Sequence, residues 1–148
     1  MSLDSPITSA FQRPAAPADA ALQRGLAIVG LLGIALIHII DLPGKLEETP
    51  YLGGAFIALI VASLLLAIVL SQRDLRIAWL LAGALAAATV VGYVLSRTTG
   101  LPASDEDIGN WLEPLGLASL FVEGTVVVVT ATALWRSSAR ALVPATPN

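Results

Sequence analysis

The sequence predicts an all-α membrane protein, an antiparallel bundle of four transmembrane helices. Hydrophobic residues make up 56% of the chain and charged residues only 13%, against about 25% charged residues in a typical soluble domain. The mean hydropathy is +0.81. Four apolar runs alternate with polar connections, and each run is close to the ~20 residues that cross a ~30 Å hydrocarbon core as a helix.

The four apolar runs predict spans at about residues 23–41, 52–70, 77–95 and 115–134. Helices are expected because backbone polar groups inside lipid must be satisfied within their own segment. The fourth run is rich in valine, but its length favours a helix over a buried strand. Pro114 is expected to open it. The first run is not expected to be a cleaved signal peptide, since no Ala-x-Ala site follows it.

The segments between and beyond the spans contain residues that interrupt helices. Residues 1–20 and 136–148 are rich in Pro, Ala and Ser, and we expect both tails to be disordered, with the domain of four helices between them at 21–135. Pro43-Gly44 predicts a turn after the first span. Pro50 is expected at the start of the second span, where its missing N–H costs little, with Thr49 as its cap.

Glycines inside the spans predict close packing of one helix on another. They are Gly30 and Gly33 in the first span, Gly53 and Gly54 in the second, and Gly83 in the third.

The charges predict the orientation of the chain in its membrane. Six Lys and Arg side chains lie in the two tails and in the connection of the second and third spans, and only Lys45 and Arg97 lie on the opposite side. Seven acids accompany these two cations, against three on the other side. The positive-inside rule then predicts a multi-pass protein of a bacterial inner membrane with both termini in the cytoplasm.

The composition also excludes several kinds of chemistry. The chain has no cysteine, which excludes thiol redox chemistry, iron–sulfur clusters and cysteine zinc sites. Its one histidine cannot form a bis-histidine haem site within a single chain, although a dimer could share one haem. No basic stretch indicates nucleic acid. No serine-histidine-aspartate elbow, phosphate loop or zinc-protease motif is present, so an enzyme is the least favoured class.

An ionisable side chain inside a span is the strongest sign of function. Glu123 lies eight residues beyond Leu115, about 12 Å below the membrane boundary at ~1.5 Å per residue. His38 ends the first span in the same half of the bundle, and Asp41 shares its helix face. Such groups usually face the bundle interior and pair, so we expect His38 to approach Glu123, directly or through water. Both residues could instead serve only to bind helices together.

A second polar group is expected at the same end of the third and fourth spans. Tyr93 and Arg97 are four residues apart on one helix face, and we expect Arg97 to pair with Glu113. Alternatively, Arg97 extends to the lipid headgroups, and Tyr93 belongs to an aromatic belt with Tyr51 and Trp111. The acidic run 105–107 has the composition of a solvated loop.

Imidazole and carboxylate ligands together suit a divalent transition metal. The candidate metal ligands are His38, Glu47, Glu48 and Glu123. The sequence therefore allows a divalent metal as a cofactor, without identifying one.

Two stretches resemble a family of small four-span integral membrane proteins of actinobacteria. They are HIIDLPGKLEETPYLGGAF from His38 and YVLSRTTGLPASDEDIGNWLEPLGLASLFVEG from Tyr93, about a third of the chain. The shared pattern is a histidine ending the first span, an EE-P-YLG loop, and an SR-x-x-GLP … EPLG … E signature. Some relatives carry a second histidine where Lys45 lies here, which weakens a metal site in this chain. The resemblance implies a fold, and no activity.

Three functions remain open. The first is the binding or sensing of a cation or small ligand through the polar cluster of His38, Asp41, Tyr93, Arg97, Glu113 and Glu123. The second is an accessory subunit that packs beside a larger membrane complex. The third is a proton-coupled transporter or channel, which would need a homo-oligomer because four spans rarely enclose a pathway. The lipid bilayer is a partner in all three.

Overall fold

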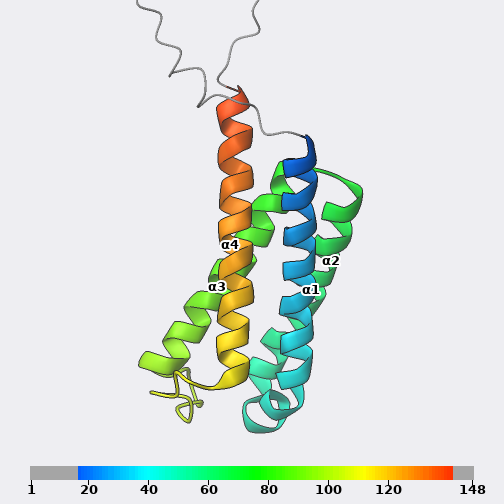
Figure 1. Ribbon diagram of the computed structural model, residues 1–148. Helices are drawn as coiled ribbons and strands as arrows, with labels where there is room; N and C mark the ends of the chain where they lie inside the picture. Colours follow the sequence, from blue (N-terminus) through cyan, green and yellow to red (C-terminus); the bar gives the residue numbers. More distant parts are fainter. Residues whose placement is uncertain (1–16, 142–148) are drawn as a thin grey trace, which may run out of the picture.

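The computed structural model describes the backbone of residues 17–141 and the side chains of residues 18–139. It contains four long helices joined by short connections (Figure 1). They are α1 (Pro17–Glu48), α2 (Pro50–Gln72), α3 (Arg76–Thr98) and α4 (Pro114–Ala141). All four are long and apolar enough to cross a membrane. The predicted all-α bundle is confirmed.

The bundle has two distinct ends (Figure 1). At one end α1 begins, α4 finishes and a tight turn joins α2 to α3; we call it the termini end. The α1–α2 connection and the longer α3–α4 loop lie at the other, the loop end. The large exposed side chains along the helices are mostly apolar, which is the surface expected of a chain immersed in lipid. The protein is therefore a multi-pass membrane protein.

Helix α1 is longer than the sequence predicts. The expected turn at Pro43-Gly44 is wrong, because the helix continues through Pro43 to Glu48. A proline removes one backbone hydrogen bond from a helix, and contacts near the helix end compensate for that loss here. Leu46 packs closely against Gly53 at the start of α2, and the Lys45 ammonium forms ion pairs.

The tails are also shorter than expected. Residues 17–20 belong to α1, and α4 continues through residue 136 to Ala141. The remaining parts of both predicted tails, 1–16 and 142–148, lie outside the described residues.

Prolines and polar side chains set the helix boundaries. Pro50 is at the first position of α2 and Pro114 opens α4, as predicted. Thr49 precedes α2, but its side chain makes no capping hydrogen bond, so that part of the prediction is wrong. At the turn between α2 and α3, Trp79 Nε1 donates a 2.6 Å hydrogen bond to the Asp74 carboxylate.

Small residues bring α1 and α3 close to α4. A Cβ added at Gly30 would collide with Val126, and one added at Gly33 would lie 3.1 Å from Val122. On α3, a Cβ at Gly83 would lie 2.7 Å from the Thr130 hydroxyl. The predicted role in helix packing is confirmed at these three glycines. It is wrong at Gly54, where nothing lies within 4 Å of an added Cβ.

Helices α2 and α3 contact each other much less than the other neighbouring helices do. Their contact is at the termini end, where Ala67 and Leu70 of α2 share a core with Ala78 and Trp79 of α3. From there α3 slants away from α2 toward the loop end (Figure 1). The bundle is consequently tight at the termini end and open between α2 and α3 at the loop end.

Candidate functional site

A single cavity of about 730 Å³ occupies the loop-end half of the bundle, and all four helices line it. The six residues that the sequence predicts as a ligand or proton site all lie on its wall: His38, Asp41, Tyr93, Arg97, Glu113 and Glu123. Residues separated by as much as 85 positions in the chain therefore meet in one place.

His38 is held in a defined orientation on α1. Its side chain belongs to the buried stripe of the helix and is only 7% exposed. The ring Nδ1 lies 2.9 Å from the backbone carbonyl oxygen of Ile34. A carbonyl oxygen only accepts, so Nδ1 carries a proton, which leaves Nε2 as the acceptor in the neutral form of the ring. Phe56 of α2 holds the ring edge-on, with 4.7 Å between the two ring centroids.

Glu123 lies opposite His38 on α4. Its side chain is 1% exposed, and the Ser119 hydroxyl donates a 2.8 Å hydrogen bond to Oε1. The same oxygen lies 3.8 Å from His38 Nε2, which confirms the predicted approach of the two side chains. The other oxygen, Oε2, is buried and accepts no hydrogen bond from the described residues; the nearby Thr89 hydroxyl donates instead to the backbone carbonyl oxygens of Leu85 and Ala86.

With a neutral imidazole and an ionised carboxylate, the His38–Glu123 pair has more acceptors than donors. A neutral imidazole presents a lone pair at Nε2, and an ionised carboxylate offers acceptors only. A buried polar group without a partner costs about 1–3 kcal/mol. A proton, a metal ion or an N–H donor placed between the two side chains would remove that cost.

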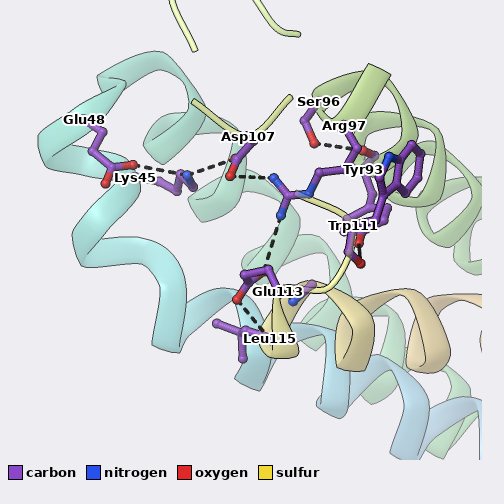
Figure 2. Close-up of polar contacts among 10 residues, drawn as sticks. Lys45, Glu48, Tyr93, Ser96, Arg97, Asp107, Trp111, Glu113 and Leu115 are labelled. Carbon is purple, nitrogen blue, oxygen red and sulfur yellow. Dashed lines mark hydrogen bonds and ion pairs between the residues drawn. The ribbon is translucent and has the colours of Figure 1, made fainter. Parts of the chain in front are cut away.

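A chain of ion pairs surrounds Arg97 at the loop end of the cavity (Figure 2). The guanidinium is 6% exposed and contacts the Asp107 carboxylate at 2.5 Å and the Glu113 carboxylate at 3.4 Å, so the predicted Arg97–Glu113 pair is confirmed. Asp107 also contacts the Lys45 ammonium at 3.4 Å, and Lys45 contacts Glu48 at 3.2 Å. The chain of pairs ties α1, α3 and the α3–α4 loop together.

Glu113 has a second role that the sequence did not predict. Its carboxylate accepts hydrogen bonds from the backbone N–H groups of Leu115 at 3.0 Å and Gly116 at 2.7 Å (Figure 2 draws the bond to Leu115). These are free donors in the first turn of α4, and an acid at this position satisfies them. Glu113 therefore caps α4 and pairs with Arg97 at once.

The aromatic residues of the loop end contact the arginine as well as the interface. Arg97 Cζ lies 5.0 Å from the centroid of the Tyr93 ring, within the range of a cation–π interaction. Tyr93 meets Trp111 edge-to-face, and its hydroxyl donates to the Trp111 carbonyl oxygen at 3.2 Å.

Asp41 differs from the acids that surround Arg97. It is half-buried and lines the cavity, yet it makes no ion pair with any lysine or arginine among residues 18–139. The two cations on the cavity wall, Lys45 and Arg97, are each shared between two acids. Of the four carboxyl groups on the cavity wall, Asp41 and Glu123 are thus the two that form no ion pair with a lysine or arginine.

The four candidate metal ligands do not come together. His38 and Glu123 are neighbours, but Glu48 pairs with Lys45 and Glu47 is exposed. Among the described residues, no group of three or more histidine, aspartate or glutamate side chains is arranged to hold a metal ion. A metal at this site would have only the imidazole and one carboxylate as protein ligands.

Several residues of the site were missed from the sequence. Asp107 is the most important, because an acid within an acidic run looks like part of a solvated loop. Ser119 and Phe56 carried no signal at all, since a lone serine or phenylalanine in an apolar span is ordinary. Lys45 did carry a signal, because an isolated cation at the loop end requires a counter-ion.

Comparisons of the chain with protein-family models, with curated proteins and with solved structures found no match. The geometry of the cavity is therefore the basis for the functional argument.

Proposed function

We propose that this membrane protein binds a small cationic or protonated ligand in the cavity at the loop end. One observation carries the proposal: Glu123, buried in the bundle, keeps a carboxylate oxygen without a partner and faces a bare acceptor of His38 inside that cavity. Ionisable groups within a membrane are costly and usually serve function.

The charge of the cavity wall favours a cation over an anion. The wall carries Lys45 and Arg97, which are already paired with acids, together with four carboxyl groups. An anion would have to displace a carboxylate from one of these cations. A cation meets free acceptors at Glu123 and Asp41 without breaking any ion pair.

Native mass spectrometry of the protein, gently extracted from its own membranes, tests this proposal. We expect a mass of one 15.3 kDa chain, or a multiple of it, plus a ligand-sized increment. Glu123→Gln keeps the shape of the side chain but removes its charge, and it should lose the increment. Glu106→Gln is the matched control, because Glu106 is an exposed loop acid, and this variant should retain it.

Two outcomes would contradict the proposal. The wild-type chain without any increment would show that the cluster only holds the helices together. Release of the chain with a larger, unrelated protein would favour an accessory subunit. Circular dichroism of each variant separates loss of ligand from loss of fold.

We further propose that the loop end faces the outside of a bacterial inner membrane and that both termini are cytoplasmic. The support is the excess of basic residues in the tails and the α2–α3 turn. The chain has no cysteine, so a single introduced cysteine is an unambiguous probe. In intact cells, an impermeant maleimide should label Asn110→Cys and should not label Ser137→Cys; the reverse pattern would refute this orientation.

A further inference from the structure

The cavity is partly covered at the loop end and opens toward the side of the bundle. The α3–α4 loop is fastened over the corner between α1 and α2. Tyr51 donates a 2.7 Å hydrogen bond to the Pro102 carbonyl oxygen, and Lys45 forms its ion pair with Asp107 of the same loop. Arg97, which is buried, adds a further tie to Asp107. This layer of contacts covers part of the loop end of the cavity, where the side chains of Asp107 and Glu113 remain 23% and 35% exposed.

The side opening lies between α2 and α3. Residues of both helices line the cavity and are at the same time exposed on the surface, namely Ala55 and Ala58 of α2 and Ala88 of α3. Exposed small residues on the cavity wall are expected where the cavity reaches the outside. The sparse contact of α2 with α3 agrees with an opening here.

The surroundings of this opening are apolar. Large exposed side chains beside it, such as Ile57, Val61 and Val91, are those expected to face lipid tails. The walls inside the opening are formed by residues such as Leu59, Leu85 and Phe56, and the polar atoms of His38 and Glu123 lie among them. A molecule that enters from lipid thus meets hydrocarbon-like walls first and an unpartnered carboxylate oxygen at the far side.

We propose that the ligand is an amphiphilic organic cation, an amine with an apolar tail, which enters from the bilayer between α2 and α3 and places its ammonium group between Glu123 and His38. This inference rests on the proposed function and adds the class of ligand and its route. An ammonium group donates up to three hydrogen bonds. Glu123 Oε2 and His38 Nε2 are two acceptors available to it.

The single histidine of the chain provides a direct test. The protein with histidine labelled with ¹⁵N at its two ring nitrogens is placed in phosphatidylcholine nanodiscs, where only the ring nitrogens of His38 are observed. Dodecylamine, methylamine and dodecyl sulfate are added separately. We expect dodecylamine to shift the Nε2 signal in a saturable manner, methylamine to act only at concentrations at least 10-fold higher, and dodecyl sulfate to cause no saturable shift.

Variants separate the route from the site. Ala58→Trp should obstruct the opening and slow or weaken the response to dodecylamine about 10-fold or more. The matched control Leu64→Trp, at an exposed position of the same helix that does not line the cavity, should respond like the wild type. Glu123→Gln should weaken binding by about 10- to 100-fold, the range of a charge-assisted hydrogen bond.

The outcomes also distinguish this inference from the proposed function. If methylamine shifts the His38 signal as strongly as dodecylamine, and Ala58→Trp has no effect, the site binds cations from water and the lateral route is wrong. A saturable response to dodecyl sulfate in place of dodecylamine would overturn the cationic class of ligand. If neither amine shifts the signal and the extracted protein carries no ligand mass, both proposals fail.

Discussion

Close contact between α1 and α4 holds the site together, and it depends on Gly30. A Cβ added at Gly30 would collide with Val126 Cγ2, and Val126 is fully buried. A β-branched side chain in a helix has one strongly preferred rotamer, so valine cannot turn aside. Gly30→Ala should therefore force α1 and α4 apart, although alanine is otherwise the better helix former.

The magnitude follows from two opposing effects. Replacing glycine by alanine inside a helix gains about 1 kcal/mol. Inserting a methyl group into a packed contact costs about 1–3 kcal/mol. The net effect of Gly30→Ala on the free energy of unfolding is then a loss of about 0–2 kcal/mol. Gly25→Ala, on the same helix with nothing within 4 Å of the new Cβ, should be about 1 kcal/mol more stable than the wild type.

A double-mutant cycle measured by reversible unfolding in mixed detergent micelles isolates the collision. Val126→Ala removes the methyl group that the new Cβ meets, so Gly30→Ala should cost less in that background, with a coupling of about 1–3 kcal/mol. If the two substitutions add within about 0.5 kcal/mol, or if Gly30→Ala and Gly25→Ala stabilise the protein equally, then the close approach of α1 to α4 is not present and the reasoning is wrong.

Two further predictions concern polar contacts that the sequence did not reveal. Asp107→Asn should destabilise the bundle by about 1–2 kcal/mol, because Asp107 lies between two cations. The control Asp105→Asn, at an exposed position, should change the free energy of unfolding by less than about 0.5 kcal/mol, and equal effects of the two variants would mean that the acidic run is merely solvated. Trp79→Phe removes the hydrogen bond to Asp74 and should lower the free energy of unfolding by about 1–2 kcal/mol in the same assay. The control Trp135→Phe, at an exposed position, should leave that free energy unchanged, and an unchanged value for Trp79→Phe would show that this bond does not stabilise the turn.

The bundle itself could be predicted because each of its causes is local in the sequence. A run of about 20 apolar residues is sufficient for a span, and Pro50 and Pro114 mark helix starts through their own covalent geometry. The same local argument was wrong at Pro43, because helix continuation there is stabilised by contacts with residues distant in sequence. The ion pair of Lys45 with Asp107 is such a contact.

The site could be predicted only in part, for a related reason. His38, Arg97 and Glu123 are conspicuous because ionisable side chains are rare in spans, and depth alone brings them to one level of the bundle. Asp107 is in an irregular loop with no periodicity to place it. Its position depends on Gly109, which adopts a positive φ of 79° and donates its N–H to the Arg97 carbonyl oxygen. Such a loop becomes interpretable only once the helices that it joins are in place.

A purely structural polar cluster would be expected to satisfy its own groups and to pack closely. Around Arg97 the guanidinium is paired with the carboxylates of Asp107 and Glu113, although its Nε and Nη1 atoms have no hydrogen bond of good geometry. The loop-end cluster does not satisfy its groups at Glu123, where a buried carboxylate oxygen faces the cavity without a partner. The packing of α2 on α3 also differs between the two ends of the bundle. At the termini end Ala67 and Trp79 belong to one shared core, whereas toward the loop end, the half that contains Glu123, the two helices contact each other little. At Glu123 an unpartnered carboxylate oxygen and a cavity thus occur together, which is the arrangement that a bound cation would complete.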